Sequence, residues 1–319
     1  MPQHFASVDD VLGEAESRYF GVGHSRVEYS FSDYAVTSTA RCSAEINGTW
    51  SQKGEQQQVP HASTLDAMVM ANTMAERHCL DVLNYSESKV ARLFPARVTV
   101  RAGSEPSPID GMHLSASLEQ VASLNPAELV FRVMVASLEV RLVLVEIDPS
   151  RLDETELVGS ALSGDVVRRP RETRIENLVL SDDAAQVEAA AYVQQAKIPP
   201  AQYGLGWQVS DRLQLTEALL VCAQVCQVMI YQHDQIDRAE SENLWMRRIE
   251  IELFPDRPLR PGQPTVIQGA IDRVTDVPLG EKVFRSFRVS GGSGHLRCSA
   301  NIAHALPPRT LAELMRSAR

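Results

Sequence analysis

One histidine stands where a proton acceptor would be most useful, directly before a long apolar segment. His61 lies in VPHASTLD, and the apolar residues that follow it predict a helix. Because an imidazole titrates near neutral pH, His61 could take a proton from a hydroxyl group or from an acidic carbon. A loop histidine can equally be bonded to nearby backbone, so the sequence leaves two interpretations open.

Two carboxylates stand at the head of the two most apolar segments. Asp66 opens DAMVMANTMAE, and Glu217 opens EALLVCAQVCQ. Asp66 follows Ser63 at capping-box spacing and could serve either as a cap or in catalysis. If the second helix begins near position 210, Glu217 lies inside it among apolar residues, where burial favours a carboxyl group that can donate a proton. We therefore take His61, Glu217 and Asp66 as the candidate catalytic residues.

Other side chains on these two segments are candidates for substrate binding. Asn72 and Glu76 are four residues apart and share one helical face, and Gln224 shares a face with Glu217. The candidate substrate-binding residues are Ser63, Asn72, Glu76, Gln224 and Met70. The histidines form no metal-binding spacing such as HExxH, and no phosphate-binding loop is present, so we expect no metal and no other cofactor.

The chain contains one unit twice, in tandem. RVEYSFSD at 26–33 matches RIENLVLSD at 174–182, and the two carboxylate-headed segments match without gaps. Further on, LVFRVMV at 129–135 matches KVFRSFRV at 282–289. Three matches in the same order indicate a duplication, because each alone would be weak evidence.

Each copy reads as a strand hairpin, a long apolar helix and three or four more strands. The alternating strands predict antiparallel sheet, and a helix with so little polar surface must be wrapped by that sheet. We therefore predict an α+β fold, a tandem (double) hotdog with two long buried helices, each wrapped by a curved antiparallel sheet. Residues 1–150 would form the first repeat, 151–173 a charged linker, and 174–319 the second repeat with a C-terminal helix. Active sites are then expected at the seam between the copies.

The composition narrows the class of protein further. The formal net charge of -10 disfavours a nucleic-acid binder, which usually presents a basic face. The five cysteines include no CxxC pair, as is usual for reduced thiols inside the cell. No signal peptide and no membrane-length apolar run is evident, so we expect a soluble, cytoplasmic protein without membrane partners.

The opening stretch carries a family resemblance. VDDVLGEAESRYFGVGHSRVEYSFSDY, followed by HASTLDAMVMANTMAE, resembles the avirulence protein D (AvrD) family over most of the chain. A histidine, a small polar residue and Asp-Ala at the head of a buried helix also resemble the tandem-hotdog, A-factor-type butyrolactone synthases. The resemblance implies synthesis of a lactone-type signal. AvrD is associated with syringolides, assembled from a β-ketoacyl unit and a ketopentose, and the related synthases join a β-ketoacyl carrier thioester to a hydroxylated three-carbon phosphate.

We accordingly expect a biosynthetic enzyme of the acyltransferase or condensation type. It would join a β-ketoacyl thioester, free or on an acyl carrier protein, to a hydroxylated ketose or ketose phosphate, and a homodimer is compatible with this. His61 would deprotonate the attacking hydroxyl, amides near Thr64–Asp66 would hold the thioester oxyanion, and Glu217 would orient the sugar or relay a proton. An acyl tunnel would be lined by Met68, Met70 and Met74.

Two other functions remain open. A hotdog dehydratase (hydro-lyase) acting on a β-hydroxyacyl thioester could use His61 with Glu217, although the glycine and proline that follow the dehydratase histidine are missing. A non-enzymatic sensor of a lipid-like ligand is the other, and a seam without an acid within reach of His61 would favour it. An acidic carrier protein would need a basic patch, and two runs could provide it. The first run is Arg168, Arg169, Arg171 and Arg174, and the second is Arg247 and Arg248.

Overall fold

The structure is a computed structural model that describes most of the chain. The described residues are 1–35, 39–103, 106–109, 113–148, 150, 170–194, 205–206, 211–241, 243–260, 262–280 and 282–307. Most of the expected linker, with Arg168 and Arg169, and the expected C-terminal helix lie outside these residues.

The strands come in two series that follow the predicted order. In the first half they are β2 (Val27–Ala35), β3 (Thr39–Ile46), β6 (Leu93–Arg101), β7 (His113–Val121), β8 (Glu128–Val135) and β9 (Leu138–Glu146). In the second half they are β10 (Thr173–Leu180), β11 (Gln186–Val193), β12 (Trp245–Leu253), β13 (Thr265–Leu279), β14 (Lys282–Gly292) and β15 (Leu296–Ala305). Alternating burial along β6, β12 and β15 gives each strand an inner apolar and an outer polar face.

All these strands join one antiparallel sheet in which the strand order is repeated. The sheet has 13 strands in the order β1-β10-β11-β13-β14-β15-β12-β6-β9-β8-β7-β3-β2. Read toward the centre, the series β2-β3-β7-β8-β9-β6 has the same order as β10-β11-β13-β14-β15-β12, and β1 is added outside β10. The two series meet where β12 pairs antiparallel with β6, with Ile249 opposite Val100. This repeated order is what the sequence matches between the halves predict.

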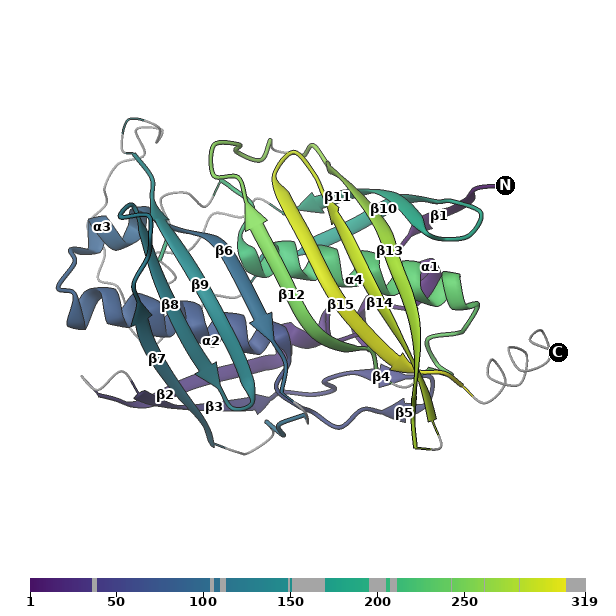
Figure 1. Cartoon of the computed structure of the whole chain (residues 1–319), viewed down its shortest axis with the longest axis horizontal. Coiled ribbons are helices and arrows are strands. Elements are labelled where there is room, and N and C mark those ends of the chain that lie inside the picture. Colours follow the sequence, from purple (N-terminus) through teal and green to yellow (C-terminus); the bar gives the residue numbers. More distant parts are fainter. Residues whose placement is uncertain are drawn as a thin grey trace.

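Two helices lie on the inner side of the sheet (Figure 1). They are α2 (Thr64–Arg77), which continues into a π-helical turn at His78–Val82, and α4 (Leu215–Asp234), and they pack against each other. The prediction of two long helices holds for α4, with 20 residues, whereas α2 has 14. A short helix, α3 (Glu87–Arg92), leads from α2 into β6.

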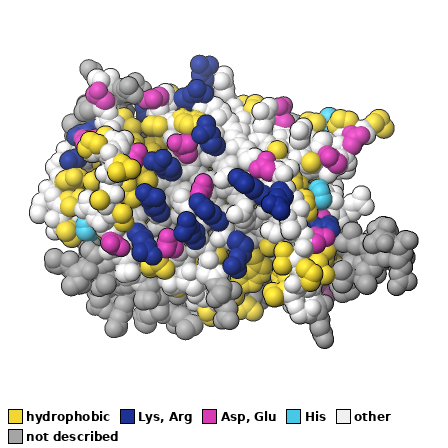
Figure 2. Space-filling model, in the orientation of Figure 1, with side chains coloured by type: hydrophobic (Ala, Val, Ile, Leu, Met, Phe, Trp, Pro, Cys, Tyr) yellow, Lys and Arg dark blue, Asp and Glu magenta, His cyan; other side chains and the backbone are white. Residues whose placement is uncertain are grey.

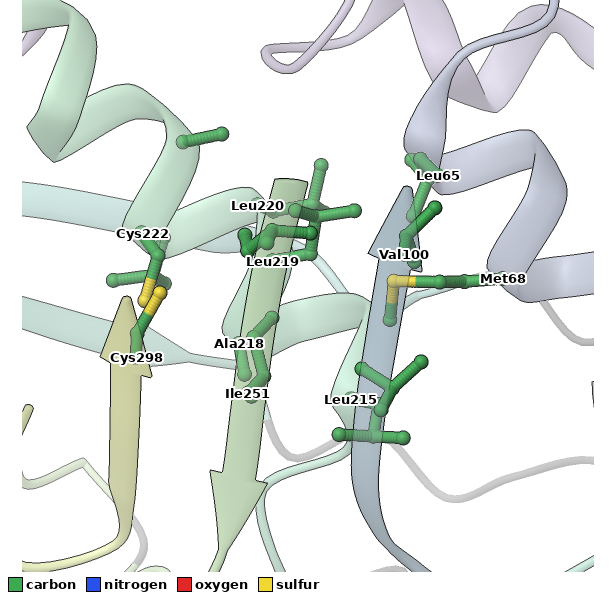
Figure 3. Close-up of a cluster of buried hydrophobic side chains, with 14 of the residues drawn as sticks. Leu65, Met68, Val100, Leu215, Ala218, Leu219, Leu220, Cys222, Ile251 and Cys298 are labelled. Carbon is green, nitrogen blue, oxygen red and sulfur yellow. The ribbon is translucent and has the colours of Figure 1, made fainter. Parts of the chain in front are cut away.

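The core runs without interruption across the junction of the two halves. Figure 3 shows Leu65 of α2 and Val100 of β6 on one side, and Leu219 of α4 with Ile251 of β12 on the other. All four side chains are buried. In the same view the sulfur atoms of Cys222 and Cys298 lie side by side, and their contact together with burial raises the pKa of Cys298. Both thiols are buried and pack as apolar groups.

The N-terminal segment crosses from one half to the other. Its first strand, β1 (Gln3–Ser7), pairs with β10 at the edge of the second half. The chain then passes through α1 (Asp9–Leu12) and two 3-10 turns, η1 (Ala15–Ser17) and η2 (Gly23–Arg26), to reach β2 in the first half. A small hairpin of β4 (Gln52–Lys53) and β5 (Gln56–Gln57) precedes α2.

By length and composition α4 could cross a membrane. However, 78% of its apolar window is buried inside the structure, as in the core helix of a folded domain.

Candidate functional site

A pocket lies where the two halves and the N-terminal segment meet. Its volume is about 150 Å³, which is small beside the ~300–1,000 Å³ typical of sites for drug-sized ligands. The first half contributes the loop before α2 and the end of β6, and the second half contributes α4 and the start of β12. The lining includes Arg18, Tyr19, Phe20, Trp50, Lys53, His61, Ser63, Thr64, Ala102, Leu138, Ala223, Gln227, Tyr231, Arg238, Leu244, Trp245, Met246 and Ile302.

His61 is the ionisable imidazole of this pocket. Its Nδ1 lies 3.1 Å from the carbonyl oxygen of Val59, and a carbonyl can only accept, so Nδ1 carries the proton. In the neutral imidazole Nε2 is then left as an acceptor for a substrate proton. Trp50 meets the ring edge-on, with centroids 4.8 Å apart. His61 thus has the hydrogen bond to nearby backbone that a structural role predicts. Its Nε2 has no hydrogen-bond partner among the described residues, as a catalytic base requires.

Trp50 brings an unsatisfied donor to the same pocket. Its side chain is buried, and its indole Nε1 has no hydrogen-bond partner among the residues that the structure describes. A buried donor without a partner costs free energy. An acceptor atom on a ligand would remove that cost.

Three cationic side chains also line the pocket. They are Arg18, Lys53 and Arg238, and none of the described lining residues is an aspartate or glutamate. Burial lowers the pKa of Arg18, and repulsion from Arg238 lowers it further, although Asp9 partly opposes both effects. Burial likewise lowers the pKa of Arg238. Two guanidinium groups whose pKa values are lowered by burial, close enough for Arg238 to repel Arg18, make the pocket favourable for an anion.

Asp66 anchors the start of α2 through Ser63 and Tyr19, and it does not line the pocket. It forms the predicted capping box with Ser63, in which the Ser63 amide donates to Oδ2 at 2.7 Å and Ser63 Oγ accepts from the Asp66 amide at 3.1 Å. Its Oδ1 accepts from the hydroxyl of Tyr19 at 2.6 Å and from that of Tyr29. Burial and the Asp66 charge raise the pKa of Tyr19. With both oxygens occupied and no exposed surface, Asp66 acts as the cap and anchor.

Glu217 caps α4, contrary to the expectation that it lies inside the helix. The helix begins at Leu215, so Glu217 is its third residue and forms a capping box with Gln214. Arg171 donates to both carboxylate oxygens, at 2.5 and 2.7 Å. Glu217 does not line the pocket, and it lies six residues before Ala223, the first α4 residue that does, or about 9 Å along the axis. Among the described residues Glu217 is bonded to Arg171 and has no contact with His61, so the structure shows no support for the predicted pairing.

Ser63 lines the pocket, whereas the other predicted substrate-binding residues lie away from it. Gln224 is buried and accepts a hydrogen bond from Arg18 at 3.0 Å, so it positions a pocket residue. Glu76 accepts from the Leu205 amide at 2.7 Å. Asn72 keeps a buried Oδ1 without a partner in the described part of the chain. Met70 is fully buried in the core, as is Met74, so these methionines do not form the expected acyl tunnel.

Sequence reasoning missed the residues that the N-terminal segment and β12 bring to the pocket. Tyr19 opens the YFGVGH segment at 19–24 of the family-like opening stretch, and Arg18 directly precedes it, which is the one signal that could have found them. Gln227 aligns with Glu76 in the internal repeat, so the repeat also pointed to its position. Nothing in the local sequence marks Trp245 or Arg238.

Together, the seam pocket combines a histidine, the N-terminus of a helix and three cationic side chains. The chain belongs to the AvrD family, since the family model described as Pseudomonas avirulence D protein (AvrD) matches residues 3–307. No curated protein matches the sequence.

Among solved structures, the 12:0-ACP thioesterase from Umbellularia californica is similar with a TM-score of 0.45 and 12% identity, over 93% of this chain and 97% of that chain. A putative oleoyl thioesterase from Lactobacillus plantarum gives a TM-score of 0.43 and 9% identity, over 90% and 99%. A trans-AT PKS dehydratase domain from Brevibacillus brevis gives 0.38 and 8%, over 76% and 85%. Scores and identities this low leave the function to the chain's own residues.

Proposed function

We propose that this AvrD-family chain is a cytoplasmic tandem-hotdog enzyme, with repeats at 1–150 and 174–319, that joins a β-ketoacyl thioester to a hydroxylated ketose or ketose phosphate. The product would be an acylated, lactone-forming molecule of the syringolide or butenolide kind. The observation that carries the proposal is the convergence of His61, the N-terminus of α2 and three cations in one pocket at the seam.

His61 is the general base in this proposal. Nε2 takes the proton of a ketose hydroxyl as its oxygen attacks the thioester carbon. The carbon–sulfur bond then breaks, and the proton on His61 passes to the departing thiolate. A single imidazole can accept and return this proton, so the transfer needs no second acid.

The N-terminus of α2 is the proposed oxyanion site. The amides of Thr64 and Leu65 are in the first turn, where helix geometry provides no intrahelical acceptor. The Asp66 amide already donates to Ser63 Oγ, so the proposed site has two amides and not the whole expected span Thr64–Asp66. Two amides and the helix dipole favour the negative oxygen that develops in the transition state.

The cations and Trp50 would hold the acceptor substrate. Arg18 and Arg238 suit a phosphate or a cluster of hydroxyl oxygens, and the unpartnered Nε1 of Trp50 suits one further acceptor atom. The apolar side of the pocket, with Leu138, Leu244 and Met246, would receive the acyl end next to the thioester.

Two other functions make different demands on the pocket. Dehydration of a β-hydroxyacyl thioester needs an acid near His61, and the described lining contains no carboxylate. That observation favours a ligand sensor over a dehydratase. Acyl transfer is compatible with it, because only a base and an oxyanion site are needed.

Release of thiol from a β-ketoacyl thioester, with and without a ketose phosphate, tests the proposal. We expect thiol release that depends on the acceptor. A loss of water without thiol release would identify a hydro-lyase. Tight ligand binding with neither reaction would identify a sensor.

A further inference from the structure

The outer face of the sheet has arginines directly opposite each other on neighbouring strands. Arg101 on β6 faces Arg248 on β12, Arg132 on β8 faces Arg141 on β9, and Arg273 on β13 faces Arg288 on β14. All six are exposed. Like charges directly opposite on a sheet are destabilising, because their Cβ atoms are only ~4.5–5.5 Å apart. Three such pairs on a chain of net charge -10 call for a functional explanation.

Two of these pairs lie in one row across the sheet. Arg101 faces Arg248, Arg248 faces Asn301, Asn301 faces Arg288, and Arg288 faces Arg273. Figure 2 shows Lys and Arg side chains gathered over the middle of this face. We call Arg101, Arg248, Arg273 and Arg288 the arginine row.

Part of this charge forms no ion pair in the described part of the chain, and the carboxylate opposite Arg101, that of Glu139 on β9, is bonded to Arg132. Arg248 pairs with Glu250, and farther along the same face Arg97 pairs with Glu128 and Arg297 with Glu252. Within the described ranges no ion pair is found for Arg101, Arg273 or Arg288. The row therefore keeps a positive surplus.

The row ends beside the seam pocket. Ala102 directly follows Arg101, and Trp245 and Met246 come shortly before Arg248. Ala102, Trp245 and Met246 all line the pocket. The amide of Ala102 donates to the carbonyl of Arg247 at 3.1 Å, which joins the two strand ends there. A β-bulge between Met246 and Arg248 turns the exposed Arg247 out beside the row.

We propose that the arginine row is the docking surface for an acidic acyl carrier protein, which presents its thioester-bound acyl chain to the seam pocket. This rests on the proposed function, because it assumes that the pocket takes an acyl thioester. Charge complementarity supports it: an acidic carrier would be repelled by the acidic chain as a whole and attracted by this face. The position supports it too, since a carrier on the row would have its prosthetic arm beside Ala102 and Trp245.

The first predicted run for carrier docking is described only in part, because Arg168 and Arg169 lie outside the described residues. Arg171 is tied to Glu217 with only 11% of its side chain exposed, so it is not available to a partner. Arg174 on β10 pairs with Glu176 and lies over the ring of Tyr192 on the neighbouring strand β11. Both strands are far from β6 and β12 in the strand order of the sheet. The second predicted run, Arg247 and Arg248, belongs to the surface proposed here.

The test is the double variant Arg101→Glu/Arg248→Glu, with Lys89→Glu/Arg174→Glu as a matched control of equal charge change. Binding of an acyl-loaded bacterial acyl carrier protein is measured by titration at low salt, and turnover is measured with that carrier and with a small N-acetylcysteamine thioester. We expect the row variant to bind the carrier at least about 10-fold more weakly and to lose carrier-dependent turnover equally, with the small thioester unaffected. The control variant should bind like the wild type.

A single change separates docking from folding. Arg288→Glu places a carboxylate opposite Arg273 and has the neutral Asn301 on its other side, so it should raise the melting temperature while weakening carrier binding. Equal carrier binding by both double variants would overturn the docking proposal. So would wild-type binding to anionic lipid vesicles or single-stranded DNA but not to the carrier. Failure of the proposed function looks different: the wild type would bind the carrier and turn over neither thioester.

Discussion

The imidazole of His61 stacks on the indole of Trp245, with ring centroids 6.4 Å apart and an interplanar angle of 21°. The histidine comes from the loop before α2 and the tryptophan from the start of β12, so each half of the chain supplies one side of this contact. Since Trp50 packs on the imidazole from the first half, the base is fixed between two indole rings. This explains why a partly exposed loop histidine can have a defined orientation.

The first prediction concerns this base. His61→Ala should lower turnover by ~10²–10⁴, as is typical when a positioned proton acceptor is lost. It should change the free energy of unfolding by only about 1 kcal/mol, because one backbone hydrogen bond is lost. His295 is a matched control outside the pocket, since its Nδ1 also lies 3.1 Å from a backbone carbonyl, that of Arg257. His295→Ala should leave turnover unchanged in the same assay.

The second prediction concerns Glu217, which the structure makes a cap. Glu217→Gln should destabilise the fold by about 3 kcal/mol, because it leaves the largely buried Arg171 without its partner. Turnover per folded molecule should stay close to wild type. Urea denaturation with a parallel activity assay measures both quantities. Adding Arg171→Met should restore part of the stability. A large loss of turnover in a stable Glu217→Gln protein would return Glu217 to the mechanism.

The third prediction is a dependence of stability on pH from Asp234 at the end of α4. Burial alone would raise the pKa of Asp234, but hydrogen bonds from His304, Arg285 and His233 outweigh it and lower that pKa. A depressed carboxyl pKa stabilises the fold above the ordinary aspartate value, near ~4, and this contribution is lost as the pH falls through the folded pKa. Asp234→Asn should therefore be destabilising at pH 7, with the difference from wild type shrinking toward pH 2.

Urea titrations at several pH values check this. The exposed Asp183 also has a pKa lowered by local hydrogen bonds, first that of Ser181, and it serves as a control. Asp183→Asn should show a much smaller dependence. A stability difference for Asp234→Asn that is constant from pH 7 to pH 2 would contradict the assignment.

The fourth prediction concerns the anion site. Inorganic phosphate should raise the melting temperature relative to chloride at equal ionic strength, because a ligand that binds only the folded state stabilises it. Arg238→Gln should remove most of this shift, since it takes one of the two mutually repelling guanidinium groups out of the pocket. Arg257→Gln, outside the pocket, should keep it. Equal shifts in both variants would place phosphate elsewhere.

The fold was predictable where local pattern and burial agree. Alternation in β6 and β12 identified strands, and the internal repeat placed them in two equivalent series. The repeat even has a chemical counterpart, since Asp66 and Glu217 occupy the same capping position in α2 and α4. What failed was the start of α4, because SDRLQL is compatible with a helix and the Gln214 cap is not a common cap residue. Because α4 begins at Leu215 and not near position 210, Glu217 is a capping residue and not the proton donor that we predicted.

The site was predictable only in part, because its other residues meet through long-range packing. His61 and Ser63 could be found from their position before a helix. Arg18 reaches the pocket because β1 pairs with β10, which draws the N-terminal segment across the seam. No local pattern contains that pairing, so the sequence alone does not place these cations in the pocket.

The central claim is that the seam pocket joins an acyl group to a hydroxylated ketose. Its most direct test is mass spectrometry of products from the purified protein, a β-ketoacyl thioester and a ketose phosphate, with His61→Ala in parallel. With the wild type we expect a product that contains both the acyl group and the ketose, together with equimolar free thiol. With the variant we expect at most a trace of this product. An adduct formed equally by both proteins, or an acyl product that contains no ketose, would contradict it.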